Sequence, residues 1–405
     1  MKKQKKLMLL GGIRYLLPVI KAAHEHNIYV ITVDYIPGNI AHKYSDEFHN
    51  VSILDKEAVL QLAQKLEIDG IMSFGVDPGV VTAAYVAEKM GLPFQCSYES
   101  ACILQDKSRF RQFLREHNFN VPNAKGYTCI EDALKDVDYY HWPVIVKPVD
   151  SAGSKGVSRV DNPEFLPKAV EYALSEAHNG HFIIEDFLEK EGCSSDTDCF
   201  SVNGTLVYCS FSDQRFDVNA KNPYTPAAYS WPSTMPKFAK EELSKELQRL
   251  MTLLNVKTGI YNIETRLCKN GKPYIMEVSP RGGGNRLAEM LHYITHANLI
   301  DNAVRNAVGE NLEEIHQPFY DGWLGEIILH SDENGIFRQI EIDEKFEKKY
   351  VIEKDLWVSN GDRVNGFSGA NQAIGTLVLR FSSYEELEKN IKDYQKYVKI
   401  VVDKI

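Results

Sequence analysis

The feature that most limits the fold of this chain is an alternation of apolar and amphipathic segments over residues 7–93. Short runs rich in Leu, Ile and Val predict strands, and the segments between them repeat their apolar residues at helical spacing. The predicted elements are a strand at 7–10, a helix at about 14–26, a strand at 28–33, a helix at 56–66, a strand at 70–74 and a helix through 83–90. Such alternation is typical of a parallel sheet wrapped by helices.

The rest of the chain indicates a mixed architecture. Between 182 and about 278 the pattern becomes α+β, with hairpin turns predicted at Asn203-Gly204 and Asn270-Gly271. Other predicted elements are a helix at about 107–117, strands at 144–148, 323–329 and 376–381, and a charged helix at 384–395. The expected fold class is therefore α/β together with α+β.

Composition excludes several classes of protein. The chain has 46 Lys and Arg against 56 Asp and Glu, a net charge of −10, which argues against nucleic acid as a partner because basic residues supply most of the affinity for a phosphate backbone. We find no run of about 18 uncharged apolar residues, so no membrane-spanning helix is expected. Seven scattered cysteines without a CxxC pair exclude a zinc ribbon and fit a reduced, cytoplasmic setting.

Two segments could bind phosphate or another anion. Gly11-Gly12 follows the first strand and Asp34 ends the second, which resembles half of a dinucleotide fingerprint, but the third glycine is missing. A tight turn or a helix N-terminus that binds an anion fits better. The second segment is the small-residue loop Ser151–Gly156, where Lys155 could add a charge, although such loops are more often plain surface turns. Lys147 strengthens the second candidate, because a lysine in a half-buried strand needs an anionic partner.

The hairpin at Asn270-Gly271 predicts a pair of facing carboxylates. With a two-residue turn, Glu264 lies opposite Glu277 and Thr265 lies opposite Met276. Directly opposed like charges destabilise a sheet unless a cation lies between them, and Mg²⁺ is a natural one. The alternative is an exposed hairpin face with solvated charges.

A glycine-rich segment follows the second of these glutamates. Arg281-Gly-Gly-Gly-Asn285-Arg286 places two arginines around three glycines, which suggests an anion pocket that needs close backbone approach. The alternative is a flexible loop with solvated arginines.

In their order, these motifs resemble the ATP-grasp enzymes, most closely the branch with biotin carboxylase, carbamoyl phosphate synthetase and glycinamide ribonucleotide synthetase. The matching motifs are Gly11-Gly12 with Asp34, Ile68–Asp77, Asp106-Lys107, Val146–Pro148, Ser151–Gly156, Ile184–Leu188, and Glu264 with Glu277–Arg281. The resemblance implies a Rossmann-like pre-ATP-grasp domain at 1–105, a two-lobed ATP-grasp domain at 106–310 and a small C-terminal α+β region at 311–405 that packs on it.

The resemblance also implies roles for individual residues. Arg281 and Lys155 would be catalytic, with Arg281 steadying the transferred phosphate or an acyl phosphate. Glu264, Glu277 and Ser279 would hold Mg²⁺ or Mn²⁺, although Ser279 stands where the family has Asn. The residues expected to bind ATP are Lys107, Lys147, Ser151, Ala152, Gly153, Ser154, Gly156, Glu185, Asp186, Phe187, Leu188 and Glu191. Glu191, or Glu189 in its place, substitutes for the usual ribose-binding acid.

The activity that this resemblance implies is an ATP-dependent carboxylate–amine ligase. It would activate a carboxylate as an acyl phosphate, with ADP and phosphate as products, for attack by an amine. A phosphotransferase on the same fold and a nucleotide-binding module without chemistry stay as alternatives. Expected partners are small-molecule carboxylate and amine substrates, and a homodimer is allowed. Residues expected near the acceptor are Asp213, Arg215, Phe216, Arg286 and the aromatic-rich stretch 224–231.

Overall fold

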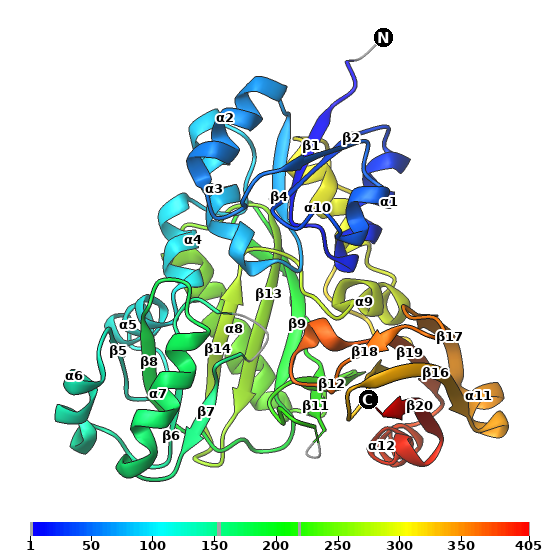
Figure 1. Cartoon of the computed structure of the whole chain (residues 1–405). Helices are drawn as coiled ribbons and strands as arrows, with labels where there is room; N and C mark the ends of the chain where they lie inside the picture. Colours follow the sequence, from blue (N-terminus) through cyan, green and yellow to red (C-terminus); the bar gives the residue numbers. More distant parts are fainter. Residues whose placement is uncertain (1–2, 152–154, 218–219, 405) are drawn as a thin grey trace.

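The computed structural model describes residues 3–151, 155–217 and 220–404. Within these ranges the strands form five sheets (Figure 1). The chain is thus a mixed α/β and α+β protein, as the sequence pattern predicts. Every helix in the described ranges is too short or too polar to traverse a lipid bilayer.

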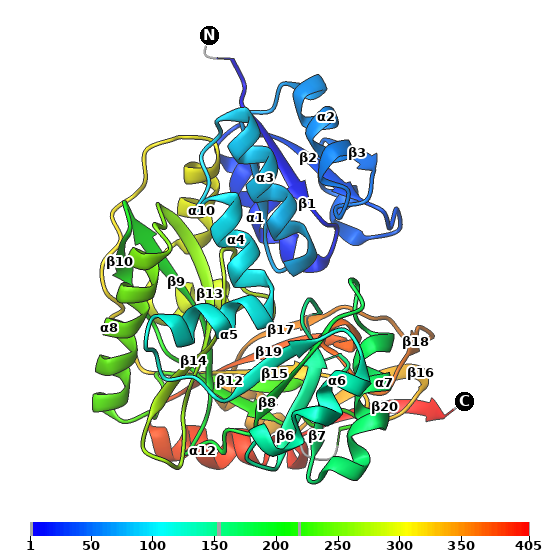
Figure 2. The ribbon, with the colours of Figure 1, turned by 90° about the vertical axis from the view of Figure 1, so that its left-hand side faces the viewer.

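The first sheet is parallel and lies at the N-terminal end of the molecule (Figures 1 and 2). Its strand order is β3-β2-β1-β4, with β1 at Lys6–Leu10, β2 at Tyr29–Asp34, β3 at Glu47–Asn50 and β4 at Gly70–Ser73. Strand β1 is buried on both faces, because Leu7 and Leu9 enter one hydrophobic core while Met8 and Leu10 enter another. Sequence analysis missed β3, whose four residues include a single apolar side chain.

Helices cover both faces of this sheet. They are α1 (Leu17–Glu25), preceded by a short 3₁₀ turn η1 (Arg14–Leu16), α2 (Lys56–Leu66) and α3 (Val80–Met90), followed by α4 (Tyr98–Gln105). Helix α10 (Leu299–Ala307) comes from far along the chain, yet packs on α1 and β4. The predicted domain boundary after residue 105 therefore separates segments that share one core, and the boundary stays a prediction.

A second lobe holds the strand that carries Lys147. Its antiparallel sheet has the order β5-β8-β6-β7 and packs against α6 and α7. The elements are α5 (Lys107–Glu116), β5 (Ala124–Tyr127), α6 (Ile130–Lys135), β6 (Val144–Pro148), β7 (Ser158–Val160), α7 (Leu166–Ser175) and β8 (Phe182–Asp186). Asp106 caps α5 by accepting hydrogen bonds from the amides of Ser108 and Arg109, which fixes where Lys107 begins its helix.

The central sheet, with the order β10-β9-β13-β14, occupies the middle of the molecule in Figure 1. Its elements are β9 (Ser195–Val202), β10 (Thr205–Tyr208), β13 (Gly259–Leu267) and β14 (Pro273–Ser279), with α8 (Lys237–Leu253) and α9 (Leu287–Thr295) packed on it. The predicted two-residue turn at Asn203-Gly204 is confirmed: Val202 pairs with Thr205, and both turn residues have positive φ.

A fourth, five-stranded sheet crosses the predicted boundary at residue 311. Its order is β11-β12-β15-β19-β17, with β11 at Asp213–Phe216, β12 at Pro226–Trp231, β15 at Trp323–Leu329, β17 at Val351–Leu356 and β19 at Gly375–Phe381. The remaining elements are β16 (Gly335–Ile342), α11 (Glu344–Tyr350), β18 (Arg363–Val364), α12 (Tyr384–Lys392) and β20 (Val398–Lys404). The C-terminal region thus continues a sheet that residues before 232 begin.

The N-terminal sheet is joined to the central sheet by a close backbone contact. Phe74 forms a β-bridge with Gly282, and the Gly75 amide donates to the Gly282 carbonyl oxygen at 2.9 Å. A methyl group on Gly282 would lie 2.2 Å from a ring carbon of Phe74. Only glycine therefore allows the loop after β14 to pack against the end of β4.

We predict that Gly282→Ala destabilises the protein by about 1–3 kcal/mol, the usual cost of forcing extra volume into a packed contact. Unfolding in urea measures the difference. Gly38→Ala is the control, because a methyl group there would have no neighbour within 4 Å. Equal stability of the Gly282→Ala variant and the wild type would contradict the contact.

Candidate functional site

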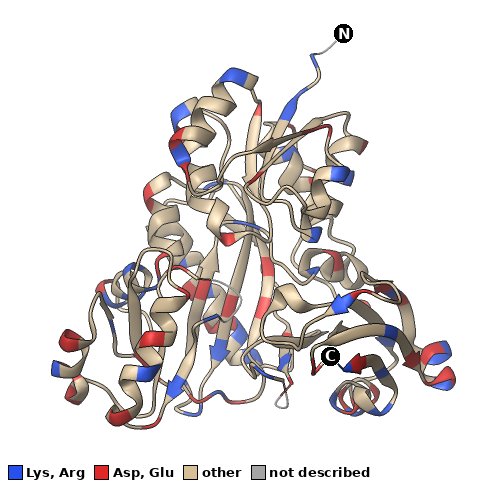
Figure 3. Ribbon diagram, in the orientation of Figure 1, with Lys and Arg blue, Asp and Glu red and all other residues tan. Residues whose placement is uncertain are grey.

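Acidic residues lie on neighbouring strands of the central sheet, where Figure 3 shows red segments in the middle of the molecule. Glu264 on β13 pairs with Glu277 on β14, as predicted, and on its other side with Asp196 on β9. We call Asp196, Glu264 and Glu277 the acidic row. Asp196 is not among the ligands predicted from the sequence, because no short-range signal indicates that β9 pairs with β13.

The acidic row carries more negative charge than its surroundings neutralise. Burial raises the pKa of Glu264 to about 7; Arg266 opposes this shift, while Asp196 and Glu277 reinforce it. Burial also raises the pKa of Asp196, against the hydrogen bonds it accepts from Asn262 and Tyr229. Opposed carboxylates at this spacing favour binding of a cation.

The side chains of Glu264 and Glu277 remain 30% and 38% exposed, so a ligand can reach them. Carboxylate oxygens that face open space suit Mg²⁺, which keeps water and phosphate oxygens as its other ligands. The residues of the acidic row therefore fit the ion that the sequence predicts, and Asp196 adds a third carboxylate to the set.

The predicted pairing of Glu264 with Glu277 is correct, but the predicted register between these residues and the hairpin loop is wrong by one residue. The loop holds three residues instead of two, since the Cys268 amide donates to the Lys272 carbonyl oxygen and Gly271 has φ +76°. A β-bulge between Glu264 and Thr265 then shifts the pairing back by one residue, so Thr265 pairs with Ile275 and not with Met276. Ile275, not Met276, enters the core.

Arg281 is held by Asp77, which begins a short 3₁₀ turn after β4. Its Nε and Nη2 donate to the two oxygens of Asp77 at 2.8 and 2.6 Å, and its Nη1 donates to the Gly282 carbonyl oxygen at 2.8 Å. Burial alone would raise the pKa of Asp77, but the Arg281 guanidinium outweighs it and holds that pKa below its usual range. The catalytic role of Arg281 stays a prediction, whereas its two hydrogen bonds to Asp77 explain how the side chain is fixed.

Two further contacts position the loop around Arg281. The Ser279 hydroxyl donates to Asp77 and accepts a hydrogen bond from Gln105. The role of Ser279 as a metal ligand stays a prediction, since both hydrogen bonds of its hydroxyl group are to other protein side chains. Asp198, on β9, accepts from the Gly283 amide at 2.8 Å, and burial raises its pKa to about 7. These contacts fix the glycine-rich segment beside the acidic row.

Lys107 lies next to the acidic row, at the start of α5. Its Nζ donates to the Ser151 carbonyl oxygen at 2.9 Å and lies 4.0 Å from Oε1 of Glu277. The structure thus brings together three residues that are spread over 170 positions of the sequence: a predicted phosphate-binding lysine, the start of the predicted phosphate loop and a predicted metal ligand.

The partner of Lys147 is a protein carboxylate. Lys147 donates to Oε1 of Glu185, and Arg111 donates from Nε to Oε2 of the same carboxylate at 2.9 Å. Burial would raise the pKa of Glu185, but Arg111 and Lys147 lower it to about 2. As expected, Lys147 has an anionic partner. Because that partner is Glu185, the burial of Lys147 does not by itself require a bound phosphate.

Part of the predicted phosphate loop, Ala152, Gly153 and Ser154, lies outside the described residues. At its edges, the Ser151 hydroxyl donates to the Glu176 carbonyl oxygen and Lys155 is exposed. Gly156 has φ +69°, and a methyl group there would lie 2.7 Å from Pro148. The roles of these residues in ATP binding and catalysis stay predictions.

The predicted adenine segment ends β8 and continues beyond it. Asp186 accepts from the backbone amide of His141 at 2.9 Å, and Phe187 stacks under the guanidinium of Arg159 at 4.7 Å. The Leu188 carbonyl oxygen accepts from Arg266 at 3.2 Å, and Glu191 is exposed. Glu189, the alternative to Glu191, forms an exposed ion pair with Lys269.

The residues predicted to lie near the acceptor are engaged with protein groups. Asp213 accepts hydrogen bonds from Ser233 and Thr234, and Arg215 pairs with Glu388 at 2.7 Å. Lys190 lies over the ring of Phe216 at 4.8 Å. Arg286 is bound to Glu289, Glu353 and Thr376. Their substrate roles stay predictions, because protein partners already account for these charges.

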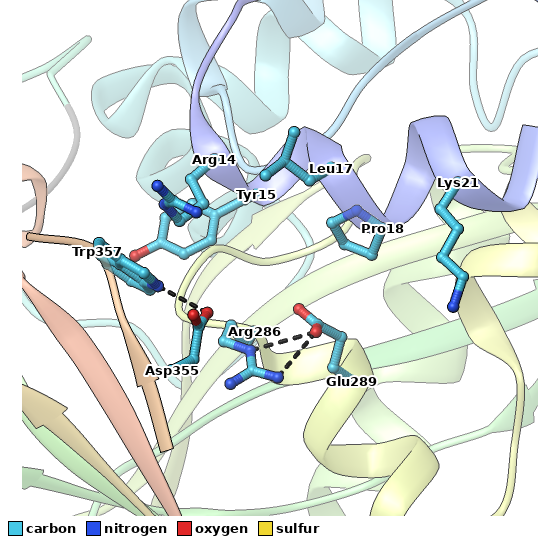
Figure 4. A pocket seen from close by; sticks show the side chains of 9 residues that line it. All are labelled: Arg14, Tyr15, Leu17, Pro18, Lys21, Arg286, Glu289, Asp355 and Trp357. Carbon is cyan, nitrogen blue, oxygen red and sulfur yellow. Dashed lines mark hydrogen bonds and ion pairs between the residues drawn. The ribbon is translucent and has the colours of Figure 1, made fainter. Parts of the chain in front are cut away.

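A cavity of about 250 Å³ lies where η1, α1, α9 and the end of β17 meet (Figure 4). Its charged lining includes Arg14, Lys21, Glu289 and Asp355, and Trp357 forms an aromatic wall. Trp357 donates from Nε1 to Asp355 at 2.7 Å, which fixes both side chains. The cavity therefore offers charges of both signs on a rigid frame.

A chain of hydrogen bonds runs from this cavity to the acidic row. Tyr15, which lines the cavity, donates to Oδ1 of Asn285 at 3.0 Å, and Asn285 donates from Nδ2 to the Tyr229 hydroxyl at 3.1 Å. Tyr229 in turn donates to Oδ2 of Asp196 at 2.9 Å. The geometry thus connects the cavity to the predicted metal ligands.

Residues 140–289 match the ATP-grasp domain family. The chain contains an ATP-grasp domain. This domain includes Lys147, the predicted adenine segment, the whole acidic row and Arg281.

Curated relatives of the ATP-grasp chain include the large chains of carbamoyl phosphate synthase. The enzyme from Thermotoga neapolitana is 24% identical over 302 residues, which cover 74% of this chain and 27% of the relative. The enzyme from Clostridium acetobutylicum is 26% identical over 265 residues, 64% of this chain and 24% of the relative. The ATP-grasp chain thus spans about a quarter of the length of these relatives.

Solved structures share the fold over the whole length. An L-amino acid ligase from Bacillus licheniformis has a TM-score of 0.80 at 21% identity, with all of both chains covered. Phosphoribosylglycinamide synthetase from Anaerococcus prevotii has a TM-score of 0.75 at 19% identity and covers 99% of this chain and 100% of its own. The described chain therefore shares the fold of these two enzymes beyond residues 140–289 as well.

We predict that Glu185→Gln destabilises the ATP-grasp protein by about 3–5 kcal/mol, because it leaves Arg111 and Lys147 buried without their counterion. The folded pKa of Glu185 is below that of the unfolded chain, so its contribution is present above pH 4–5 and is lost as the pH falls toward 2. The stability difference between wild type and variant should shrink over this window.

Urea unfolding at several pH values measures this difference. Asp132→Asn is the matched control: it removes one carboxylate from an exposed ion pair with Lys135, where water screens the charge. It should have a much smaller effect. A Glu185→Gln variant as stable as this control at neutral pH would refute the assignment of Glu185 as the buried counterion.

Proposed function

We propose that the protein is an ATP-dependent ligase that activates a carboxylate as an acyl phosphate and joins it to an amine. The observation that carries this proposal is the acidic row beside Lys107 and Arg281. Carboxylates that suit a divalent cation, together with fixed positive side chains, are what phosphoryl transfer from ATP requires. The shared fold with an L-amino acid ligase and with phosphoribosylglycinamide synthetase supports the same class of reaction.

Each part of the site then has a defined task. Lys107 binds a phosphate oxygen at the start of α5, and Arg281, oriented by Asp77, stabilises the charge that develops on the transferred phosphoryl group. Glu264, Glu277 and Asp196 would hold Mg²⁺, which would offset negative charge on the phosphates of the nucleotide. The ion pair of Lys147 with Glu185 keeps that lysine at the edge of the nucleotide site.

The products distinguish this proposal from its alternatives. A ligase releases ADP and phosphate only after both substrates react, whereas a kinase leaves a stable phosphorylated product. A nucleotide-binding module releases no ADP. The three carboxylates of the acidic row argue against such a module, because their mutual repulsion has no structural benefit without a cation.

The cavity in Figure 4 supports a finer proposal for the amine substrate. Asp355 can accept a hydrogen bond from an ammonium group, while Arg14 and Lys21 can pair with a carboxylate. A small molecule with both groups, such as an amino acid, matches this lining. The hydrogen-bond chain through Tyr15 and Asn285 connects this cavity to the acidic row, where the acyl phosphate would form.

Isotope transfer tests the proposed reaction. With a suitable acid labelled with heavy oxygen, ATP and an amine, one label should pass from the carboxylate to the released phosphate, and ADP should be the nucleotide product. Glu277→Gln should abolish turnover, because it removes a carboxylate from the acidic row. If AMP is the product, or if the phosphate released while the labelled acid and the amine are being joined carries no label, the acyl-phosphate mechanism is rejected.

The cavity proposal has its own test. Asp355→Asn should raise KM for the amine about ten- to a hundredfold, the effect expected for loss of a charge-assisted hydrogen bond. Capture of the acyl phosphate by hydroxylamine, a small neutral nucleophile, should be unchanged. Glu385→Gln, an exposed change away from the cavity lining, is the control. If KM for the amine stays at the wild-type value, the cavity is not the amine site.

A further inference from the structure

A second cluster of metal-ligating side chains lies in the C-terminal half of the molecule. It consists of Asp217, which follows β11, and of His330 and Asp332, which follow β15. One ligand atom from each lies within 4.8 Å of the other two. The side chains of Asp217 and His330 are 5% and 3% exposed, whereas Asp332 is exposed. The cluster belongs to the loops that flank the five-stranded sheet, not to the central sheet with the acidic row.

The hydrogen bonding of His330 indicates which ring nitrogen is available to a ligand. Its Nδ1 lies 2.7 Å from the Ile328 carbonyl oxygen, which can only accept, so Nδ1 carries a proton. In the neutral ring, Nε2 then has a lone pair, and that lone pair faces Oδ2 of Asp217 at 3.4 Å. Two acceptors that face each other in a buried place require a cation or a second proton between them.

The surroundings of the cluster match those of a bound metal ion. Histidines that ligate a metal usually donate their other ring N–H to a backbone carbonyl, as Nδ1 of His330 does. Ligating carboxylates are usually hydrogen-bonded as well, and Asp217 accepts from Nε2 of Gln395 at 2.9 Å. The ring of Phe367 stacks on the imidazole at 4.0 Å and fixes its plane.

We propose that Asp217, His330 and Asp332 form a site for a divalent transition-metal ion, for which Zn²⁺ is the best match. One imidazole nitrogen and two carboxylate oxygens are ligands that Zn²⁺ accepts, and the exposed side of Asp332 leaves room for water as a fourth ligand. The ion links the loop after β11 to the loop after β15. This inference does not depend on the proposed ligase activity.

An ion bound by Asp217, His330 and Asp332 would fix the position of a segment that lies next to the second lobe. Tyr224, further along the chain, has a pKa that is raised by burial, and the nearby charge of Arg159 on β7 opposes this shift. Asn222, in the same loop, donates from Nδ2 to the Ser368 carbonyl oxygen at 3.2 Å. The proposed role of the site is therefore structural: it holds together the loop after β11 and the loop after β15.

Zn²⁺ binding to the full-length protein tests the proposal. The protein is stripped of metal and titrated with Zn²⁺ against a chromogenic chelator, without nucleotide, in a Glu264→Gln/Glu277→Gln background that removes carboxylates of the acidic row. We expect one Zn²⁺ per chain. Asp332→Asn should weaken binding at least about tenfold, and this exposed change should leave the fold intact. Glu333→Gln neutralises the adjacent carboxylate, which pairs with Lys404, and should bind like its parent.

A spectroscopic measurement identifies the nitrogen ligand. In the same background, Zn²⁺ should shift the Nε2 resonance of His330 in a nitrogen-15 spectrum, and the shift should follow the titration. Absence of stoichiometric Zn²⁺ binding, equal binding by the Asp332→Asn variant, or an unshifted His330 resonance would each overturn the proposal. The first result would mean that His330 and Asp217 contact each other directly, with no metal ion between them.

Discussion

The repulsion within the acidic row is the constraint on which the rest of the structure depends. Asp196, Glu264 and Glu277 lie side by side because β9, β13 and β14 must pair in one register. On the opposite face of the sheet, Ile263 and Val278 enter the hydrophobic core. A slip by one residue would separate the carboxylates but would expose these apolar side chains. The core therefore holds the like charges together.

The cations of the protein surround the acidic row without neutralising it. Lys107 lies 4.0 Å from Glu277, and Arg266 lies 3.8 Å from Glu264. Both distances exceed those of a hydrogen bond. Arg281 is bound to Asp77 instead, so its charge is already paired. This arrangement leaves a net negative centre with positive charge at its rim, which can accept a divalent cation together with an anionic nucleotide.

Features that depend on one segment of the chain could be predicted from the sequence, whereas contacts between distant segments could not. The facing pair Glu264–Glu277 follows from a single hairpin, although a three-residue loop and a compensating bulge replace the predicted two-residue turn. The third carboxylate, Asp196, depends on pairing across more than sixty residues, which no local pattern encodes. The same limit explains Lys147: its half-buried place in a strand implied an anion, but only the pairing of β6 with β8 identifies Glu185 as that anion.

The cavity and the acidic row belong to different parts of the molecule, and one short segment relates them. Asn285 and Arg286 both have left-handed backbone conformations, with φ +48° and +56°, immediately before α9. Such conformations are uncommon outside glycine and persist where contacts over-determine them. Here Tyr15 and Tyr229 hold the Asn285 side chain from two sides, while Arg286 pairs with Glu289 and Glu353. The segment after Arg281 therefore fixes the cavity wall relative to Asp196 through direct contacts, so the distance between the cavity and the acidic row is set by the fold.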